Sequence, residues 1–222
     1  EAIDIYNKSI EGIDQINPIT LGKCTTSSFY EDPRHLLFTL ARYKFVAKMF
    51  DGFSNVLEIG CQEGFGASLI TQCSLNYTGV DFFKPYIDSA KTLYVNTTNV
   101  SFYHHDILCG PLNDSSFDGV FALDVLEHID PASEHIFMKN LLPNISANNS
   151  PLILGIPSLE SQQYASKRAK LGHVNCKTKS QLKDFCLRYF RNVFMFSMND
   201  EVLHTGFDPM SHYVLALCCF LK

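Results

Sequence analysis

A group of glycines directly after a short apolar run is the first feature of the sequence with a chemical meaning. Residues 56–59 read Val-Leu-Glu-Ile, and Gly60, Gly64 and Gly66 follow. Such a run is typical of a buried parallel strand, and glycine lets the backbone approach a ligand where a Cβ would clash. A strand, a glycine turn and a helix in that order favour a nucleotide-like ligand at the carboxyl end of the strand.

Alternating strands and helices are predicted to position this turn. Apolar residues recur mostly at helical spacing over residues 34–50, where Asp32 and Pro33 are start signals and Gly52 follows the end. Short apolar runs bounded by turn residues predict the strands. The predicted strands begin at residue 55 and continue at 77–81, 100–105, 117–123, 152–156, 193–198 and 212–220, and further helices are predicted at 65–72, 84–93, 131–142 and 179–190.

This order predicts an α/β fold with a seven-stranded, mostly parallel sheet that is flanked by helices. The last two strands follow each other without a helix, so they must form a hairpin and the last strand must run antiparallel. Residues 157–178 are expected to be a long connection. Residues 1–33 lack a clear period and are predicted to be an N-terminal extension or lid, which leaves residues 34–222 as a single domain.

Composition narrows the class of protein. The chain has 222 residues, of which 46% are hydrophobic and 18% charged, as in ordinary globular domains. A net charge of −5 argues against wholesale nucleic-acid binding. No apolar run approaches the roughly 20 residues that span a bilayer, no signal peptide is visible, and the eight cysteines form no CxxC pair. We therefore expect a cytoplasmic protein with free thiols and no membrane partner.

Together, these motifs resemble those of the class I S-adenosylmethionine-dependent methyltransferases, over roughly residues 34–222. The family's first motif is an acid, an apolar residue and Gly-x-Gly-x-Gly. Here it reads Glu58-Ile59-Gly60-Cys61-Gln62-Glu63-Gly64, with Gln62 in place of the middle glycine. Residues 123–128, Leu-Asp-Val-Leu-Glu-His, resemble a signature at the edge of the methyl-donor pocket, and the terminal hairpin is the family's sheet ending. The resemblance implies a Rossmann-like methyltransferase fold, S-adenosyl-L-methionine as cofactor and S-adenosyl-L-homocysteine as product.

The resemblance also implies which residues hold the donor. Asp81 fits the acid that binds both ribose hydroxyls, which one carboxylate can accept, and Asp106 fits the acid beside the adenine. Glu58 is expected to steady the loop amides or the donor's amino group. Arg42 or Tyr43 is expected to reach the donor's carboxylate, although Arg42 on a solvated helix face is the alternative. The donor residues expected in full are Arg42, Tyr43, Glu58, Gly60, Cys61, Gln62, Gly64, Asp81, Phe82, Asp106, Ile107 and Asp124.

The acceptor is expected beyond the same edge of the sheet, among the loops after residues 123, 156 and 198 and the N-terminal segment. Methyl transfer mainly requires alignment, and a base is needed only for an alcohol, phenol or protonated amine. His128 and His173 are the candidate catalytic bases and His204 is a further one, because an unperturbed histidine accepts a proton near neutrality. The alternative for each is a structural histidine.

A metal is the less favoured interpretation of the same region. Asp124, Glu127 and His128 have the spacing i, i+3, i+4, which on a helical turn puts them on one side. This resembles the Glu-x-x-Glu-His pattern with which some O-methyltransferases of quinone biosynthesis and the small-RNA 3′-end methyltransferases bind a divalent metal, and His173 would be a fourth ligand. Metal-free relatives also carry Leu-Glu-His, so no metal is expected.

The predicted function is methyl transfer to a small-molecule acceptor. Eight of the 18 lysines and arginines lie between Lys167 and Arg191, opposed only by Asp184. They favour an anionic acceptor if they line the cleft, and otherwise form a solvated face. An RNA methyltransferase and a protein that holds the cofactor without turnover remain as alternatives, and RNA is disfavoured because no aromatic-interleaved basic groove is visible. A dehydrogenase is disfavoured because its Gly-x-Gly-x-x-Gly spacing is absent.

Overall fold

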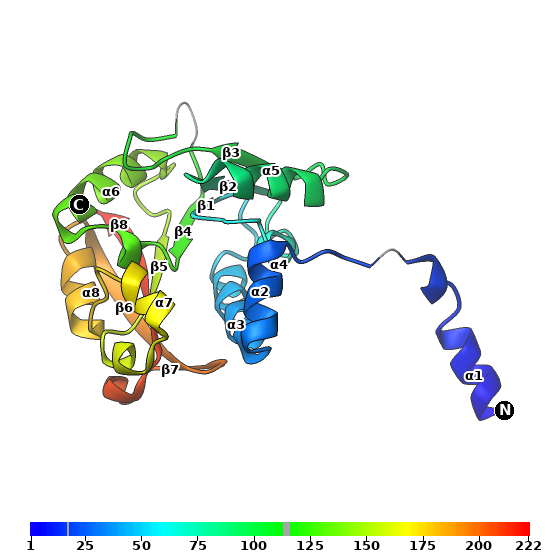
Figure 1. The fold of residues 1–222 in the computed structure, drawn as a ribbon. Helices are drawn as coiled ribbons and strands as arrows, with labels where there is room; N and C mark the ends of the chain where they lie inside the picture. The colour runs from blue at the N-terminus through cyan, green and yellow to red at the C-terminus, as the bar shows by residue number, and fades with distance from the viewer. Residues whose placement is uncertain (17, 113–115) are drawn as a thin grey trace.

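One eight-stranded sheet runs through the molecule in the order β3-β2-β1-β4-β5-β8-β6-β7 (Figure 1). The computed structural model describes residues 1–16, 18–112 and 116–222. The strands are β1 Asn55–Ile59, β2 Asn76–Asp81, β3 Val100–His104, β4 Gly119–Leu123, β5 Leu152–Pro157, β6 Phe190–Asn199, β7 Val202–His204 and β8 Tyr213–Leu221. The first five strands pair in parallel, whereas β8 is antiparallel to both β5 and β6.

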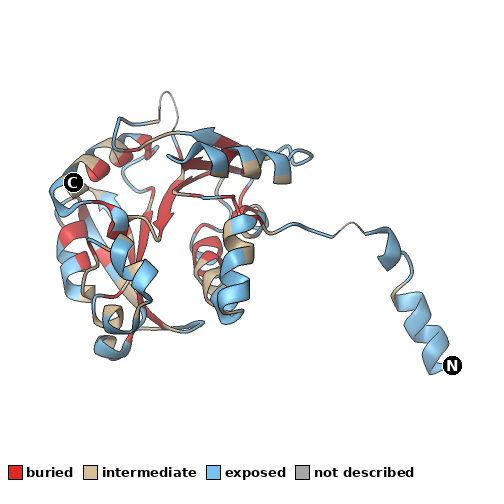
Figure 2. Ribbon diagram, viewed as in Figure 1, coloured by how far each residue is buried: buried red, intermediate tan, exposed pale blue. Residues whose placement is uncertain are grey.

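Helices cover both faces of this sheet. The α-helices are α1 Ala2–Ser9, α2 Lys23–Glu31, α3 Arg34–Met49, α4 Ala67–Ile70, α5 Lys84–Leu93, α6 Glu134–Leu141, α7 Lys167–Gly172 and α8 Lys179–Cys186. Alternate residues of β1 face opposite layers, as strand geometry requires: Leu57 packs in the cluster that includes α6 and α8, and Val56 in the cluster that includes α3 and α5. The buried residues accordingly concentrate in the strands and on the inner faces of these helices (Figure 2).

The predicted α/β fold with a mostly parallel sheet is confirmed. The seven expected strands are present, and β8 is the antiparallel strand that pairs with β6 as a hairpin. The sheet has one more strand than predicted, because the short β7 pairs with the end of β6. Three residues are too few to leave a strand period in the sequence, which is why β7 was missed.

Two predicted segments need correction. The helix expected over 179–190 ends at Cys186, and Phe190 already begins β6. The connection expected over 157–178 contains a 3₁₀ turn, Glu160–Tyr164, and α7. Ser166 caps α7 by accepting a hydrogen bond from the amide of Ala169 at 3.1 Å. A serine before a short helix is a weak start signal, and the segment has no apolar stripe that would reinforce it.

The N-terminal elements differ in their relation to the sheet. The helix α1 and the turn Ile13–Gln15 extend away from the body and contain no buried residue (Figures 1 and 2). The helix α2 lies beside α3. Within the described residues, no helix combines the length and apolarity that crossing a membrane requires. All eight cysteines have free thiols.

Candidate functional site

A cleft opens at the carboxyl ends of β1 and β4, where the strand order reverses direction. Open parallel sheets bind ligands at this switch point. Three elements besides the two strand ends contribute to its walls: the turn after β1, the helix α3 and the helix α2. The lining includes Cys24, Thr25 and Ser28 of α2, Arg42 and Tyr43 of α3, Gly60, Cys61 and Gln62 of the turn, and Leu123 and Asp124 after β4.

The turn after β1 keeps a left-handed backbone at three positions. Gly60 has φ 79°, Gly64 has φ 73° and Gln62 has φ 47°. A Cβ at Gly60 would lie 2.3 Å from the Cγ2 atom of Val125, so glycine is required there by space as well as by conformation. Gln62, the residue that departs from the glycine motif, adopts the conformation that a glycine would take at lower cost.

Asp81, at the end of β2, links that strand to the turn. Its Oδ2 atom accepts a hydrogen bond from the amide of Gln62 at 3.0 Å, and its Oδ1 atom accepts one from the amide of Phe83 at 2.8 Å. Only 5% of the residue is exposed, and burial raises the pKa of its carboxyl group despite these amides. The strand end and the glycine turn therefore form one connected unit.

Three further residues expected to bind the donor, like Asp81, lie apart from the cleft lining. Phe82 is 70% exposed, Asp106 accepts a hydrogen bond from the amide of Leu108 at 2.9 Å, and Ile107 is buried in the core. None of them is among the described residues that line the cleft. They follow β2 and β3, at the same edge of the sheet as Asp81.

Glu58 lies beneath the turn as a buried carboxyl group held by two tyrosines. The hydroxyl of Tyr43 donates to Glu58 Oε1 at 2.6 Å, and the hydroxyl of Tyr77 donates to Oε2. Burial raises the pKa of Glu58 to about 8. The ring of Tyr43 also fills the space beside Gly66, where a Cβ would lie 1.9 Å from Tyr43 Cε1. Glu58 and Tyr43, two of the three residues expected at the donor's methionyl end, thus form the floor of the turn.

Arg42 forms an ion pair across the cleft. Its Nη1 atom lies 2.8 Å and 3.1 Å from the two carboxylate oxygens of Asp124, and its Cζ atom lies 3.8 Å from the ring centroid of Tyr213. The side chain is only 20% exposed, so the alternative of a solvated helix face is wrong. Asp124 has φ 57°, so the residue that makes this ion pair has a left-handed backbone.

The two candidate histidines lie together beside the cleft, with ring centroids 5.1 Å apart. His128 Nδ1 is 2.9 Å from the carbonyl oxygen of Gly172, and His173 Nδ1 is 2.8 Å from Gln162 Oε1. Because these oxygens only accept hydrogen bonds, each Nδ1 carries a proton, so Nε2 is the nitrogen that has the lone pair when the ring is neutral. Burial, with His128 nearby, lowers the pKa of His173.

Glu127 adds a buried carboxyl group to this pair. Both of its oxygens lack a hydrogen-bond partner among the described residues, and burial raises its pKa well above the usual value. One oxygen lies 3.9 Å from His128 Nε2, and ligand atoms of Glu127, His128 and His173 all lie within 4.8 Å of one another. Asp124, the first residue of the metal pattern, instead pairs with Arg42.

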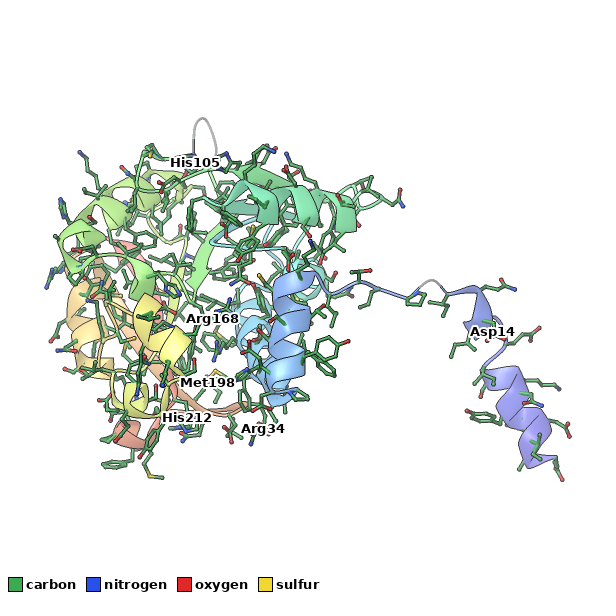
Figure 3. All side chains as sticks on the ribbon, in the orientation of Figure 1. Asp14, Arg34, His105, Arg168, Met198 and His212 are labelled. Atoms are coloured by element: carbon green, nitrogen blue, oxygen red, sulfur yellow. The ribbon has the colours of Figure 1, made fainter. Side chains whose placement is uncertain are left out.

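His204 and the basic cluster have separate surroundings. His204 Nε2 lies 2.6 Å from Asn199 Oδ1 within the β6–β7 hairpin. Glu134 pairs with Lys177 at 2.7 Å and lies 3.8 Å from Arg188. Arg168 lies 3.6 Å from Glu31, where α7 approaches α2 (Figure 3). Three of the eight basic residues between Lys167 and Arg191 are therefore paired with two acids, Glu134 and Glu31.

Several site residues escaped the sequence analysis. Tyr77 and Tyr213 hold Glu58 and Arg42 from distant parts of the chain, and Glu63 binds α2. No spacing in the sequence signals these contacts, because each joins residues that only the folded sheet brings together. The glycine motif did contain Glu63, but only its neighbours had an expected role.

Comparisons with known proteins agree with this geometry. Residues 57–141 match the family model described as a methyltransferase domain. A ubiquinone biosynthesis O-methyltransferase of Rickettsia bellii is 30% identical over 99 residues, which cover 44% of this chain and 40% of that protein. An O-methyltransferase of Aspergillus sclerotiorum is 32% identical over 80 residues, or 34% and 30% of the two chains. The chain thus matches less than half the length of these curated relatives.

Solved structures share the fold over more of the chain. The N-methyltransferase NodS of Bradyrhizobium japonicum, in complex with S-adenosyl-L-homocysteine, has a TM-score of 0.63 at 18% identity, covering 84% of this chain and 86% of that one. The methyltransferase domain of bacterial CtHen1 has a TM-score of 0.69 at 17% identity, covering 82% and 98%.

Proposed function

We propose that this chain, which belongs to the class I S-adenosylmethionine-dependent methyltransferases, binds S-adenosyl-L-methionine in the cleft above β1 and β4 and methylates a small-molecule acceptor. The product would be S-adenosyl-L-homocysteine. The observation that carries the proposal is the left-handed turn at Gly60–Gly64, at the switch point of the sheet, with the carboxylate of Asp81 bonded to it.

Residues that line the cleft, together with others that follow the neighbouring strands, fit the donor. Each oxygen of Asp81 accepts one amide hydrogen, and the remaining lone pairs suit the two ribose hydroxyls. Asp106 and Ile107 are proposed for the adenine. Arg42 uses Nη1 for Asp124, so its other nitrogens remain as donors for the methionyl carboxylate. The carboxylate of Asp124, which lines the cleft, suits a cation.

The acceptor side supplies alignment and a proton acceptor. When bound, the donor supplies an electrophilic methyl group on a sulfonium. The Nδ1 atoms of His128 and His173 are occupied by protein oxygens, so Nε2 is the atom that can take a proton, and the lowered pKa of His173 favours its neutral ring. Either histidine can take the proton of an acceptor alcohol, phenol or protonated amine.

Titration calorimetry with S-adenosyl-L-homocysteine tests the donor site directly. Asp81→Ala should weaken binding at least tenfold, because it removes the ribose acceptor and frees the amide of Gln62. Asp118→Ala is the matched control: Asp118 also accepts two backbone amides, from Ser54 and Asn55, but at the opposite end of β1. Near-normal affinity of Asp81→Ala would contradict the assignment, and binding of NAD alone would end the methyltransferase proposal.

A screen for S-adenosyl-L-homocysteine release separates the classes of acceptor. Turnover with small-molecule pools is expected, because three of the eight basic residues between Lys167 and Arg191 already pair with acids, which reduces the positive charge available to a phosphate backbone. Turnover with RNA pools alone would favour the nucleic-acid alternative. Binding of the donor without turnover on either pool would favour a protein that holds the cofactor.

A divalent metal on the acceptor side is a second candidate mechanism, and the unpartnered carboxyl group of Glu127 favours it. Glu127, His128 and His173 would be its ligands, in keeping with carboxylate and imidazole donors. Elemental analysis of the purified protein should then find a metal that is lost in Glu127→Gln and retained in His204→Ala. Activity that survives EDTA, together with a metal-free protein, would remove this mechanism.

A further inference from the structure

The helix α2 is attached to the glycine turn through a buried carboxylate. Glu63 is 3% exposed, and its two oxygens accept hydrogen bonds from the first amides of α2: Lys23 N at 2.9 Å and Cys24 N at 2.7 Å. The hydroxyl of Ser89, in α5, donates to the same carboxylate at 3.2 Å. A carboxylate that binds the free amides of a helix N-terminus stabilises that helix through hydrogen bonds and the helix dipole.

The contact between Glu63 and the first amides of α2, here called the joint, requires a glycine before the helix. Gly22 has φ 82°, and a Cβ added there would lie 2.4 Å from Glu63 Oε2. Gly22 is also the N-cap residue of α2, and it has no side chain that could cap the helix. The sequence of α2 buries no residue, so the helix lacks the apolar anchoring that holds α3 and α5. The joint at Glu63 is therefore a main attachment of α2 to the body.

The two sides of α2 face different hollows. Cys24, Thr25 and Ser28 line the cleft together with Gly60 and Gln62 of the turn. Thr26 and Ser27 instead line a shallow groove that leads to α5. The side of α2 that faces the cleft thus stands opposite the backbone that the donor is proposed to contact, and undocking of α2 would remove that wall.

We infer that α2 is a wall of the donor cleft and that Glu63 is the positioning residue that latches it, so that the donor enters and leaves when α2 undocks. The inference rests on the proposed function for the identity of the ligand. The latch itself is a property of the protein without ligand, because every contact that defines it is present within the chain. Glu63 acts through α2 and makes no contact with the donor in this assignment.

Hydrogen exchange of the free protein tests the latch. Glu63→Gln replaces one acceptor by an amide group that cannot accept, and Gly22→Ala places a Cβ against the same carboxylate. Each variant should speed exchange at residues 23–31 about tenfold, since a hydrogen bond to a charged group is lost, while exchange in α5 stays unchanged. Glu11→Gln, an exposed acid outside the joint, is the charge-matched control. Unchanged exchange in both variants would overturn the latch.

Binding kinetics test its consequence. The dissociation rate of S-adenosyl-L-homocysteine should rise about tenfold in Glu63→Gln and in Gly22→Ala, and the double variant should resemble either single one, because both act on one joint. Additive effects, or rates equal to the wild type, would contradict the inference.

A pair of matched substitutions tests the wall. Thr25→Phe places a ring in the cleft and should abolish binding of S-adenosyl-L-homocysteine, whereas Ser27→Phe places the same ring on the groove side and should leave it unchanged. Equal effects of the two would overturn the assignment of the wall. A wild-type protein that binds no S-adenosyl-L-homocysteine would overturn the proposed function and the wall, while the exchange measurement would still decide the latch.

Discussion

Gln62 is the residue at which the turn carries its backbone strain. A residue other than glycine at φ 47° costs about 1–2 kcal/mol relative to right-handed conformations. Gln62→Gly should therefore stabilise the protein modestly, by about 0.5–1 kcal/mol after the greater chain entropy of glycine in the unfolded state. Urea denaturation measures the change. A loss of stability in Gln62→Gly would contradict the assignment of strain. Gly60→Ala should instead destabilise the protein strongly, because the added Cβ would clash with Val125.

Glu58 should give the free energy of unfolding a particular dependence on pH. Burial raises its pKa from the usual 4.5 to about 8, so the folded protein keeps a proton that the unfolded chain releases. The contribution of Glu58 to the free energy of unfolding is full below pH 4.5. It declines between pH 4.5 and about pH 8, by at most about 1.4 kcal/mol per pH unit. Urea denaturation at pH 6 and pH 8.5 should show this decline in the wild type and a smaller one in Glu58→Gln. Equal declines would contradict it.

Site residues were predictable from the sequence where they belong to a local motif. The glycines of the turn and the acids at the ends of β2 and β4 lie where the sequence predicts them, because the end of a strand determines the position of the residues next to it. Their partners were not predictable. Arg42 meets Asp124 and Tyr213 only after α3 has packed on the sheet, and Tyr77 meets Glu58 across two neighbouring strands. Such contacts depend on tertiary geometry that a single sequence does not encode locally.

At the scale of elements, the ion pair of Arg42 and Asp124 couples α3 to the loop after β4. Arg42→Met removes the cation and leaves a partly buried carboxylate at a left-handed residue, so the protein should lose about 1–3 kcal/mol, less than for a fully buried pair because Asp124 is 34% exposed. A double-mutant cycle with Asp124→Asn, in which asparagine tolerates the left-handed conformation, measures the coupling by urea denaturation. A coupling energy near zero would show that the two elements are held together by other contacts.

Elements with a strong period were predicted closely, and elements held by tertiary contacts were not. The helix α5 has the predicted bounds, and α3 ends one residue early, because apolar residues repeat along one face of each. The helix α2 gives no such signal: its residues 23–31 are mostly polar, and its N-terminal cap comes from Glu63, 39 residues away from Cys24. The residue at which α2 begins therefore depends on a side chain that is distant in the sequence.

The whole molecule gathers its chemistry at one edge of the sheet. The turn after β1, Asp81 after β2 and Asp124 after β4 all follow from parallel strands that end side by side, and the histidine pair reaches this edge on the loop after β4 and on the segment after α7. The antiparallel part, β8 with β6 and β7, closes the other side of the sheet and supplies Tyr213 to Arg42. The residues proposed for donor and acceptor therefore converge, although they are spread from Arg42 to His173 in the sequence.

The N-terminal 33 residues should fall into two functional parts. Residues 1–16 bury no side chain and extend from the body (Figures 1 and 2), so their deletion should leave the melting temperature and the affinity for S-adenosyl-L-homocysteine within error of the full chain. Deletion of residues 1–33 also removes α2 and leaves the carboxylate of Glu63 without its amides, so affinity should fall at least tenfold. Thermal denaturation and calorimetry on the two truncated proteins make the comparison. Equal affinity in both would mean that α2 is dispensable and that the extension has no part in the donor site.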